Sequence, residues 1–188
     1  SSPRKARRAP STIRSGSGND AIRVTGTGAS ALSAGVINAG SGDNAVNVAA
    51  IAAGGALTVA SGGGNDRITV GALGANAVYT INAGSGNNIV ALTGDQIAGS
   101  SIATGGGNDA VTLNGVMSGG TFTTGAGADS VAIKGGFSGG TISLNGGGND
   151  SVTVTGAMSG TAKINAAAST GDLTAAIGSM SGSAIIHS

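Results

Sequence analysis

The fold is decided by Gly105-Gly106-Gly107-Asn108-Asp109-Ala110-Val111-Thr112-Leu113, a stretch that joins a glycine turn to an alternating strand. Its first five residues predict a tight turn, because Gly and Asn tolerate positive φ and Asp hydrogen-bonds within its own turn. Val111 and Leu113 stand two residues apart with small residues beside them. This period of two predicts a β-strand with one buried face.

The same turn-and-strand pattern occurs seven times along the chain. The turns end at Asp20, Asn44, Asp66, Asn88, Asp109, Asp129 and Asp150, which are 24, 22, 22, 21, 20 and 21 residues apart. Two apolar residues in alternation follow each turn: Ile22 and Val24, Val46 and Val48, Ile68 and Val70, Val90 and Leu92, Val111 and Leu113, Val131 and Ile133, and Val152 and Val154. Regularity of this kind indicates a repeat architecture.

A second, weaker glycine motif lies half a repeat later. Its copies begin at Ile97, Met117, Phe137, Met158 and Met180, and a short apolar strand such as Thr121-Phe122-Thr123 follows. Each repeat of about 21 residues therefore reads strand, turn, strand, turn, and stacked repeats would bury Val and Ile between them. The sequence predicts an all-β, right-handed parallel β-solenoid of about seven or eight coils with two short strands per coil.

Charge divides the chain into two parts. Five of the nine basic residues, Arg4, Lys5, Arg7, Arg8 and Arg14, precede Ser15, and the remainder carries a formal charge of 4 − 8 = −4. We predict a basic tail over residues 1–14 and one solenoid domain over residues 15–188. The last coil, from about residue 166, is atypical, and Asp172 ends a decayed eighth motif there. A short tail without aromatic residues favours a solvated or self-docking segment over a nucleic-acid-binding one.

Composition argues against an enzyme. The chain has no Cys, no Glu and a single His, His187, so disulfides, thiol nucleophiles, zinc sites and hydrolase triads have no residues to build them. Aromatic residues make up 2% of the chain, and there is no Trp. We also expect no membrane span, because no apolar run is long enough to cross a bilayer.

The turns resemble the RTX nonapeptide of secreted bacterial calcium-binding proteins. Ser61 to Thr69, Thr104 to Thr112 and Asn145 to Thr153 carry that pattern, and the resemblance covers roughly residues 15–155. In that family, calcium lies between successive turns, held by Asp carboxylates and glycine-region carbonyls. The resemblance implies calcium ligands at Asp20, Asp66, Asp109, Asp129, Asp150, Gly107, Gly127 and Gly148, with Asp109, Asp129 and Asp150 as the best run. The alternative is a metal-free Gly-Asn-Asp turn that is stabilised by its own hydrogen bonds.

We therefore expect a structural extracellular protein: a calcium-stiffened β-solenoid from a surface layer, adhesin or secreted fibre of bacterial type. Its open ends and uncharged last coil, residues 179–186, favour head-to-tail self-association. The alternative is a carbohydrate- or partner-binding solenoid module of a larger secreted protein. A pectate-lyase-like enzyme would need clustered acids and bases, whereas the Asp residues here form a turn column.

An ice-binding surface would need a flat outward row of Thr. The outward row after the Asp-containing turns reads Arg23, Asn47, Thr69, Ala91, Thr112, Ala132 and Thr153. This row is too mixed for such a surface.

Overall fold

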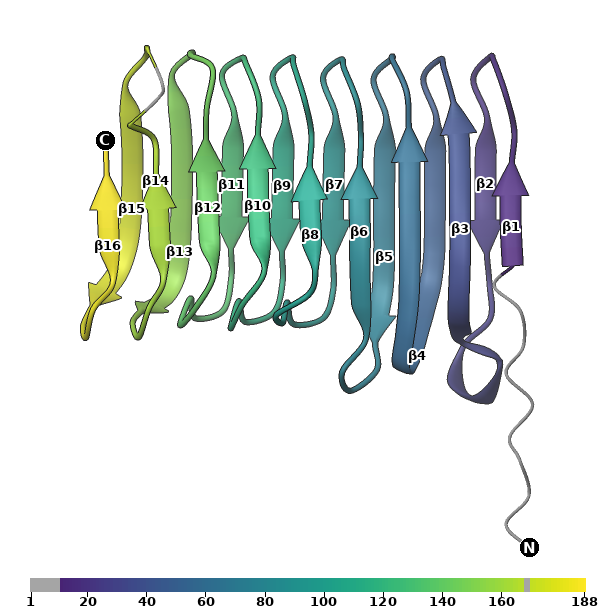
Figure 1. The fold of residues 1–188 in the computed structure, drawn as a ribbon, viewed down its shortest axis with the longest axis horizontal. Coiled ribbons are helices and arrows are strands. Elements are labelled where there is room, and N and C mark those ends of the chain that lie inside the picture. The colour runs from purple at the N-terminus through teal and green to yellow at the C-terminus, as the bar shows by residue number, and fades with distance from the viewer. Residues whose placement is uncertain (1–10, 168–169) are drawn as a thin grey trace, which may run out of the picture.

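The chain forms a parallel β-solenoid in the computed structural model, which describes residues 11–167 and 170–188. About eight coils of about 22 residues stack along one axis, as Figure 1 shows. The predicted all-β solenoid is therefore confirmed. A single 3₁₀ turn, η1 (Gly28–Ser30), is the helical element of the described residues. None of these residues forms a helix with the length and apolarity to cross a membrane.

Two columns of strands make up the walls of the solenoid. The first column contains β2 (Ala21–Val24), the start of β4 (Ala45–Ser61), β5 (Arg67–Leu73), β7 (Ile89–Leu92), β9 (Ala110–Leu113), β11 (Ser130–Ile133), β13 (Asp150–Met158) and β15 (Leu173–Met180). The second column contains β1 (Ser11–Arg14), β3 (Leu32–Gly40), the end of β4, β6 (Val78–Asn82), β8 (Ser101–Ala103), β10 (Thr121–Thr124), β12 (Thr141–Leu144), β14 (Lys163–Asn165) and β16 (Ile185–His187). β4 passes through both columns, so all the strands form one 16-stranded sheet.

The core is a thin layer between the two columns. In the strands away from the two ends of the stack, alternate residues point into this layer. Among them, Val48, Val70, Val90 and Leu92 have no measurable exposure. The three aromatic residues Tyr79, Phe122 and Phe137 are also fully buried. Stacked aliphatic rows of this kind give each coil a hydrophobic contact with both neighbours, which is how solenoids gain stability.

The solenoid begins earlier than the sequence predicts. β1 pairs in parallel with β3, from Ser11 opposite Gly35 to Arg14 opposite Asn38, so residues 11–14 belong to the first coil. The predicted tail over residues 1–14 was four residues too long, because Ile13 packs against the core and makes this segment a strand. Residues 1–10 lie outside the described part of the chain.

The last coil shifts the glycine motif by one residue. Asp150 lies opposite Leu173, so Asp172 stands in the position that Asn149 occupies one coil earlier. Asp172 therefore does not extend the column that ends at Asp150. This coil is also the least covered of the described coils, since Met180 lies in a core column and is still 48% exposed.

The second turns show a register that differs from the sequence alignment. Gln96, and not Ile97, pairs with Met117, which in turn pairs with Phe137 and Phe137 with Met158. Gln96 is fully buried, and its Oε1 accepts a hydrogen bond from the Tyr79 hydroxyl at 2.6 Å. Burial raises the pKa of the Tyr79 hydroxyl well above its usual value. A polar residue replaces Met or Phe here because a buried tyrosine supplies its partner.

Substitution of Gly127 tests how closely the turns stack. Its φ is +132°, and an added Cβ would collide with the carbonyl oxygen of Gly107 in the preceding coil. We expect Gly127→Ala to lower the free energy of unfolding by at least about 1–2 kcal/mol, the cost of a left-handed conformation before any clash. Urea unfolding followed by circular dichroism would measure this loss.

Gly106→Ala is the matched control. Its nearest non-neighbouring atom would lie 3.9 Å from the new Cβ, and the next coil already carries Ala126 at this position. We expect unchanged stability for this variant. Equal losses in both variants would mean that the tight packing of the turn backbones does not set the stability of the stack.

Candidate functional site

Seven glycine turns line one edge of the solenoid, which is the upper edge in Figure 1. Each turn ends at a residue that we call the inner residue: Asp20, Asn44, Asp66, Asn88, Asp109, Asp129 and Asp150. The glycine two positions earlier has positive φ in every turn, for example +121° at Gly107 and +132° at Gly127. This conformation is open to glycine at little cost, and it lets the turns of neighbouring coils approach closely.

The inner residues bind each coil to the coil before it. Asp109 N–H donates to Oδ1 of Asp129 at 2.8 Å, and Asp129 N–H donates to Oδ1 of Asp150 at 2.9 Å. The same bond is present at every step from Asp20 to Asp150, with N···O distances from 2.7 to 3.1 Å. Asn and Asp serve equally well here, because both offer an Oδ1 acceptor.

A second ladder lies on the exposed side of the turns, one residue earlier. Its side chains are Asn19, Asp43, Asn65, Asn87 and Asn108, which we call the outer residues. Oδ1 of each accepts the N–H of the equivalent residue one coil later, at 2.7 to 2.8 Å. The outer ladder therefore runs in the opposite direction to the inner one, and the two together fix the register of the stack.

The two inner Asn residues reveal what the interior of the turn requires. Nδ2 of Asn44 donates to the carbonyl of Gly42 at 2.7 Å. Nδ2 of Asn88 donates to the carbonyl of Gly86 at 2.9 Å and to that of Thr104 at 3.2 Å. The side-chain atom outside the ladder, Nδ2 in these two turns, thus faces backbone carbonyl oxygens. The turn interior therefore favours a hydrogen-bond donor at this position.

The inner Asp residues put an oxygen where Asn puts an N–H donor. Oδ2 is buried and has no hydrogen-bond partner among the described residues at Asp20, Asp66, Asp109 and Asp129. The last three side chains are only 2% exposed. An ionised carboxylate buried among carbonyl oxygens is costly unless a proton or a cation lies between them. Each of these turns is therefore a candidate cation site or the site of a neutral carboxylic acid.

Hydroxyl groups accompany four of the five inner Asp residues and neither of the two inner Asn residues. Five positions before Asp20, Asp66, Asp109 and Asp129 stand Ser15, Ser61, Thr104 and Thr124. Five positions before Asn44 and Asn88 stand Ala39 and Ala83. This pairing was not found in the sequence, although it could have been read there by counting back from each turn. A hydroxyl adds an oxygen ligand or a proton donor where the turn holds a carboxylate.

The threonines of this set are the most buried hydroxyls of the site. Thr104 and Thr124 have no measurable exposure, and neither Oγ1 makes a hydrogen bond of regular geometry among the described residues, although each hydroxyl lies close enough to the Asp109 or Asp129 carboxylate to lower its pKa. The serines differ, since Ser15 and Ser61 donate to the carbonyls of Ala39 and Ala83 at 2.8 and 3.1 Å. The oxygens left without partners are therefore concentrated at the Asp109 and Asp129 turns.

Burial dominates the electrostatics of these two turns. It raises the pKa of Asp109 and Asp129, although the backbone N–H that each accepts and the nearby Thr104 or Thr124 hydroxyl lower the pKa in part. The charges of Asp109 and Asp150, one coil to either side, raise the pKa of Asp129 further. Like charges one coil apart thus favour a proton or a bound cation at Asp129.

The structure brings the predicted ligands into one column, but it does not treat them alike. Asp20, Asp66, Asp109 and Asp129 each have a hydroxyl neighbour, whereas the residue that aligns with Thr124 before Asp150 is Leu144. Gly107, Gly127 and Gly148 occupy the positive-φ position in their turns. No three acidic or histidine side chains converge at one point among the described residues, so each turn supplies one carboxylate.

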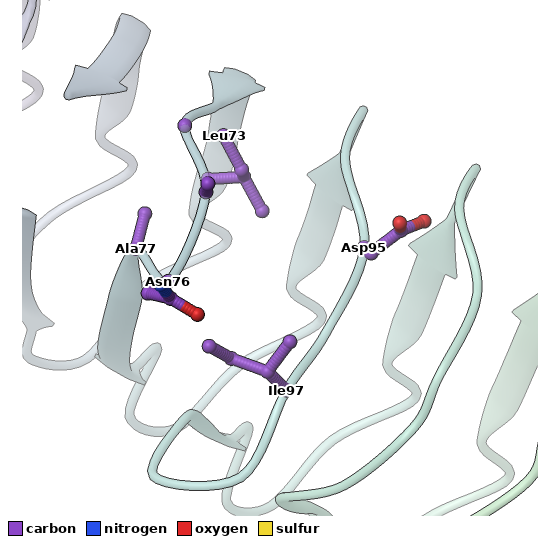
Figure 2. A pocket seen from close by; sticks show the side chains of 7 residues that line it. Leu73, Asn76, Ala77, Asp95 and Ile97 are labelled. Carbon is purple, nitrogen blue, oxygen red and sulfur yellow. The ribbon is translucent and has the colours of Figure 1, made fainter. Parts of the chain in front are cut away.

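The opposite edge of the solenoid holds a separate shallow hollow. It has a volume of about 130 Å³ and is lined by residues that include Leu73, Asn76, Asp95 and Ile97. Figure 2 shows Asp95 at the far side of this hollow from Leu73 and Ala77. Oδ1 of Asp95 accepts the N–H of Val116 at 2.7 Å, so this carboxylate fixes the adjacent turn. The hollow therefore brings one carboxylate together with aliphatic side chains.

Comparisons with protein families, with curated proteins and with solved structures find no match to this chain. The chemistry of the site therefore rests on its own residues.

The pH dependence of stability follows from the raised pKa of Asp109 and Asp129. A raised folded-state pKa stabilises the fold below the unfolded value, here 3.8, and that stability is lost as the pH rises through the folded-state pKa. In a chelating buffer, we expect the melting temperature to be highest near about pH 3 and to fall toward neutral pH. Calorimetry at a series of pH values measures this trend.

The double variant Asp109→Asn, Asp129→Asn is the control for that trend. Asn cannot titrate, and Asn44 and Asn88 already occupy this position in other turns. We expect its melting temperature to vary much less with pH. A wild-type chain that is most stable at neutral pH in chelator would contradict the assignment of buried, proton-binding carboxylates.

Proposed function

We propose that this chain is a structural extracellular β-solenoid, stiffened by calcium inside its glycine turns, from a surface layer, adhesin or secreted fibre. The observation that carries the proposal is the set of buried, unpartnered oxygens at the Asp turns. Calcium prefers six to eight hard oxygen ligands, and carboxylate, hydroxyl and carbonyl oxygens all meet in these turns. Secretion from a bacterial cell is implied by the resemblance to RTX proteins.

The residues of the Asp109 and Asp129 turns fit a hard cation best. Asp109 with Thr104 and Asp129 with Thr124 each supply a carboxylate and a hydroxyl oxygen, and Gly107 and Gly127 supply carbonyls. When bound, calcium supplies positive charge that neutralises neighbouring buried carboxylates. The inner Asn turns do not fit a cation, because Nδ2 of Asn44 and Asn88 already donates to the carbonyls that would bind it.

A variant that exchanges one atom distinguishes a cation from a metal-free turn. We expect Asp129→Asn to stabilise the chain in chelator by about 1–3 kcal/mol, because Nδ2 would donate where Oδ2 is unsatisfied. In millimolar calcium, we expect the same variant to be less stable than the wild type and to bind less calcium. Isothermal titration and calorimetry with and without calcium measure the two effects.

Asp43→Asn is the matched control for that experiment. Asp43 is an exposed outer residue, Asn stands at the same position in five other turns, and the Oδ1 of Asp43 accepts the N–H of Asn65 at 2.7 Å. We expect no change in calcium binding or stability. If the wild-type protein binds no calcium at millimolar concentration, the calcium proposal is wrong and the turns are metal-free.

A structural role agrees better with the surface than a carbohydrate-binding role does. Sugar-binding surfaces generally use exposed aromatic side chains as platforms, yet Tyr79, Phe122 and Phe137 are at most 1% exposed. These three residues are all the aromatic residues of the chain. The extended wall of short strands offers instead a rod that can bear contacts along its length.

Self-association through the solenoid ends is the second part of the proposal. The last described coil leaves core-facing side chains partly uncovered, among them Leu173, Ile177, Ile186 and Met180. At the first coil, Ile13 and Val24 are likewise only partly buried. The end of one copy and the start of the next both offer strand edges and apolar side chains, so a head-to-tail stack would cover both.

Two lysine substitutions test this association. Met180→Lys places a charge on the open end, and we expect it to abolish self-association at high protein concentration in calcium. Ile185→Lys is the control, because Ile185 follows Lys163 in an outward row and is similarly exposed, at 41%. Analytical ultracentrifugation of both variants and the wild type measures the result. Monomers in all three samples would show that the end-to-end proposal is wrong.

A further inference from the structure

The second column of strands carries an ordered outward row of hydroxyl side chains. In register, this row contains Thr58 on β4, Thr80 on β6, Ser101 on β8, Thr121 on β10 and Thr141 on β12. Five consecutive coils therefore place a hydroxyl at the same position of the strand. The mixed outward row that argued against an ice-binding surface belongs to the first column of strands and not to this one.

A second outward row runs parallel to the first, two residues later along each strand. It consists of small, uncharged residues: Ala60, Asn82, Ala103, Thr123 and Ser143. We call the ten residues of these two rows the Thr face. Charged residues appear only at its limits, with Arg14 in the first coil and Lys163 in the coil after Thr141.

Buried core residues lie between the two rows and fix the strands that carry the Thr face. The residues between the two rows are Val59, Ile81, Ile102, Phe122 and Ile142, and each is at most 1% exposed. Thr58, Thr80 and Thr121 are exposed on the outer side of the same strands. A threonine on a strand is stiff at χ1, so its hydroxyl and methyl groups keep fixed positions.

The hydroxyls of the first row are free for an external partner. Among the described residues, none of Thr58, Thr80, Ser101, Thr121 and Thr141 makes a side-chain hydrogen bond within the chain, in contrast to Ser15, Ser61 and Ser118. Neighbouring strands place equivalent atoms about 4.8 Å apart, and residues i and i+2 of one strand lie about 6.6 Å apart. No register shift interrupts the pairing of β4 with β6, β6 with β8, β8 with β10 or β10 with β12. The result is a regular, two-dimensional array of hydroxyl and methyl groups that includes one amide, that of Asn82, whose Oδ1 accepts the N–H of Gly84 at 3.0 Å.

An array of this kind matches a ligand that is itself a flat periodic array of hydrogen-bonding groups. Ice is such a ligand, because its surface presents water oxygens at regular spacings of a few ångströms, similar to those of the Thr face. Charged side chains would keep their own strongly bound hydration, and the Thr face has none over five coils. Fixed side chains also spare the ordering cost that mobile ones would add on binding.

The first column of strands provides an internal comparison. Its outward rows alternate Thr69, Ala91, Thr112, Ala132 and Thr153, and the row beside them includes Arg67 and the exposed Ile89. The same backbone array is therefore present on both walls. The first wall carries hydroxyls in three consecutive coils, at Ser130, Ser151 and Thr174, whereas the second wall carries them in five.

We propose that the Thr face binds ice, so that the chain is an ice-binding solenoid as well as a structural one. Ordered water held between the methyl groups and hydrogen-bonded to the hydroxyls would join the face to the crystal. This surface is separate from the glycine turns, which lie at the edge between the two walls. The inference does not depend on which ion, if any, those turns bind.

Thermal hysteresis of the folded chain in calcium tests the proposal. We expect the wild type to lower the freezing point of ice crystals below their melting point and to produce faceted crystals. Thr80→Tyr with Thr121→Tyr puts two bulky rings on the flat face, and we expect the activity to fall by about tenfold or more, as a loss of about 1.4 kcal/mol of binding free energy would give. Circular dichroism and calorimetry establish that the variant is folded.

Thr112→Tyr, on the opposite wall, is the matched control and should keep full activity. If the double variant fails to fold, Thr121→Lys replaces it, since the same outward row already carries Lys163 opposite Thr141. Absence of hysteresis in the folded wild type overturns the proposal, and so does an equal loss in Thr112→Tyr. The chain can also be tested on microcrystalline cellulose and for pairing with a second copy. If Thr80→Tyr abolishes either of these interactions while the activity on ice is unchanged, the ice-binding proposal is wrong and the face binds that other partner.

Calcium titrations separate this inference from the proposed function. We expect the Thr face variants to bind calcium as the wild type does, and we expect Asp129→Asn to leave the Thr face unchanged. Hysteresis without calcium binding would refute the calcium proposal alone. Calcium binding without hysteresis would refute the ice-binding proposal alone.

Discussion

The stack depends on one repeated contact, the acceptance of a backbone N–H by Oδ1 of an inner residue in the next coil. This bond requires an Asp or Asn at the end of every glycine turn, and it requires glycine before it so that neighbouring turn backbones can touch. The remaining side-chain oxygen or nitrogen is then forced into the turn interior. The chemistry of the turn is thus a consequence of how the coils are aligned.

Alternation of Asp and Asn moderates the cost of this arrangement in the first half of the stack. Asn44 and Asn88 separate Asp20, Asp66 and Asp109, which doubles the distance between carboxylates and roughly halves their Coulomb repulsion. Asp109, Asp129 and Asp150 follow one another without such a spacer. The second half therefore concentrates negative charge, and the unpartnered threonine hydroxyls occur at two of these three turns. Negative charge and candidate oxygen ligands are thus both concentrated in the second half of the stack.

The sequence predicted the solenoid, its repeat length and the Asp column, because strong period-two strands directly follow each glycine turn. It did not predict features that lie before the turn or beyond the second turn. Thr104 and Thr124 stand five positions before the inner Asp, and aligning the turns on their last residue did not compare that position between the Asp and the Asn turns. Gln96 and the Thr58-to-Thr141 row lie beyond second turns whose lengths vary, and counting residues from one glycine motif to the next then misplaces the register. Register there is set by buried pairs such as Tyr79 with Gln96, which only the fold reveals.

The opposite directions of the inner and outer ladders have a mechanical consequence. The first coil is held to the second by one bond of each ladder together with its strand pairing. The last coil is held by the outer bond from Asp172 N–H to Asn149 Oδ1 and by strand pairing, because Leu173 stands in the inner position, so resistance to tension is lower from the C-terminal end. Because the bonds of one coil fail together, the chain would extend in discrete steps and not smoothly. Each coil of 20 to 24 residues would release roughly 70–80 Å of contour length, which makes the solenoid a stepwise molecular spring.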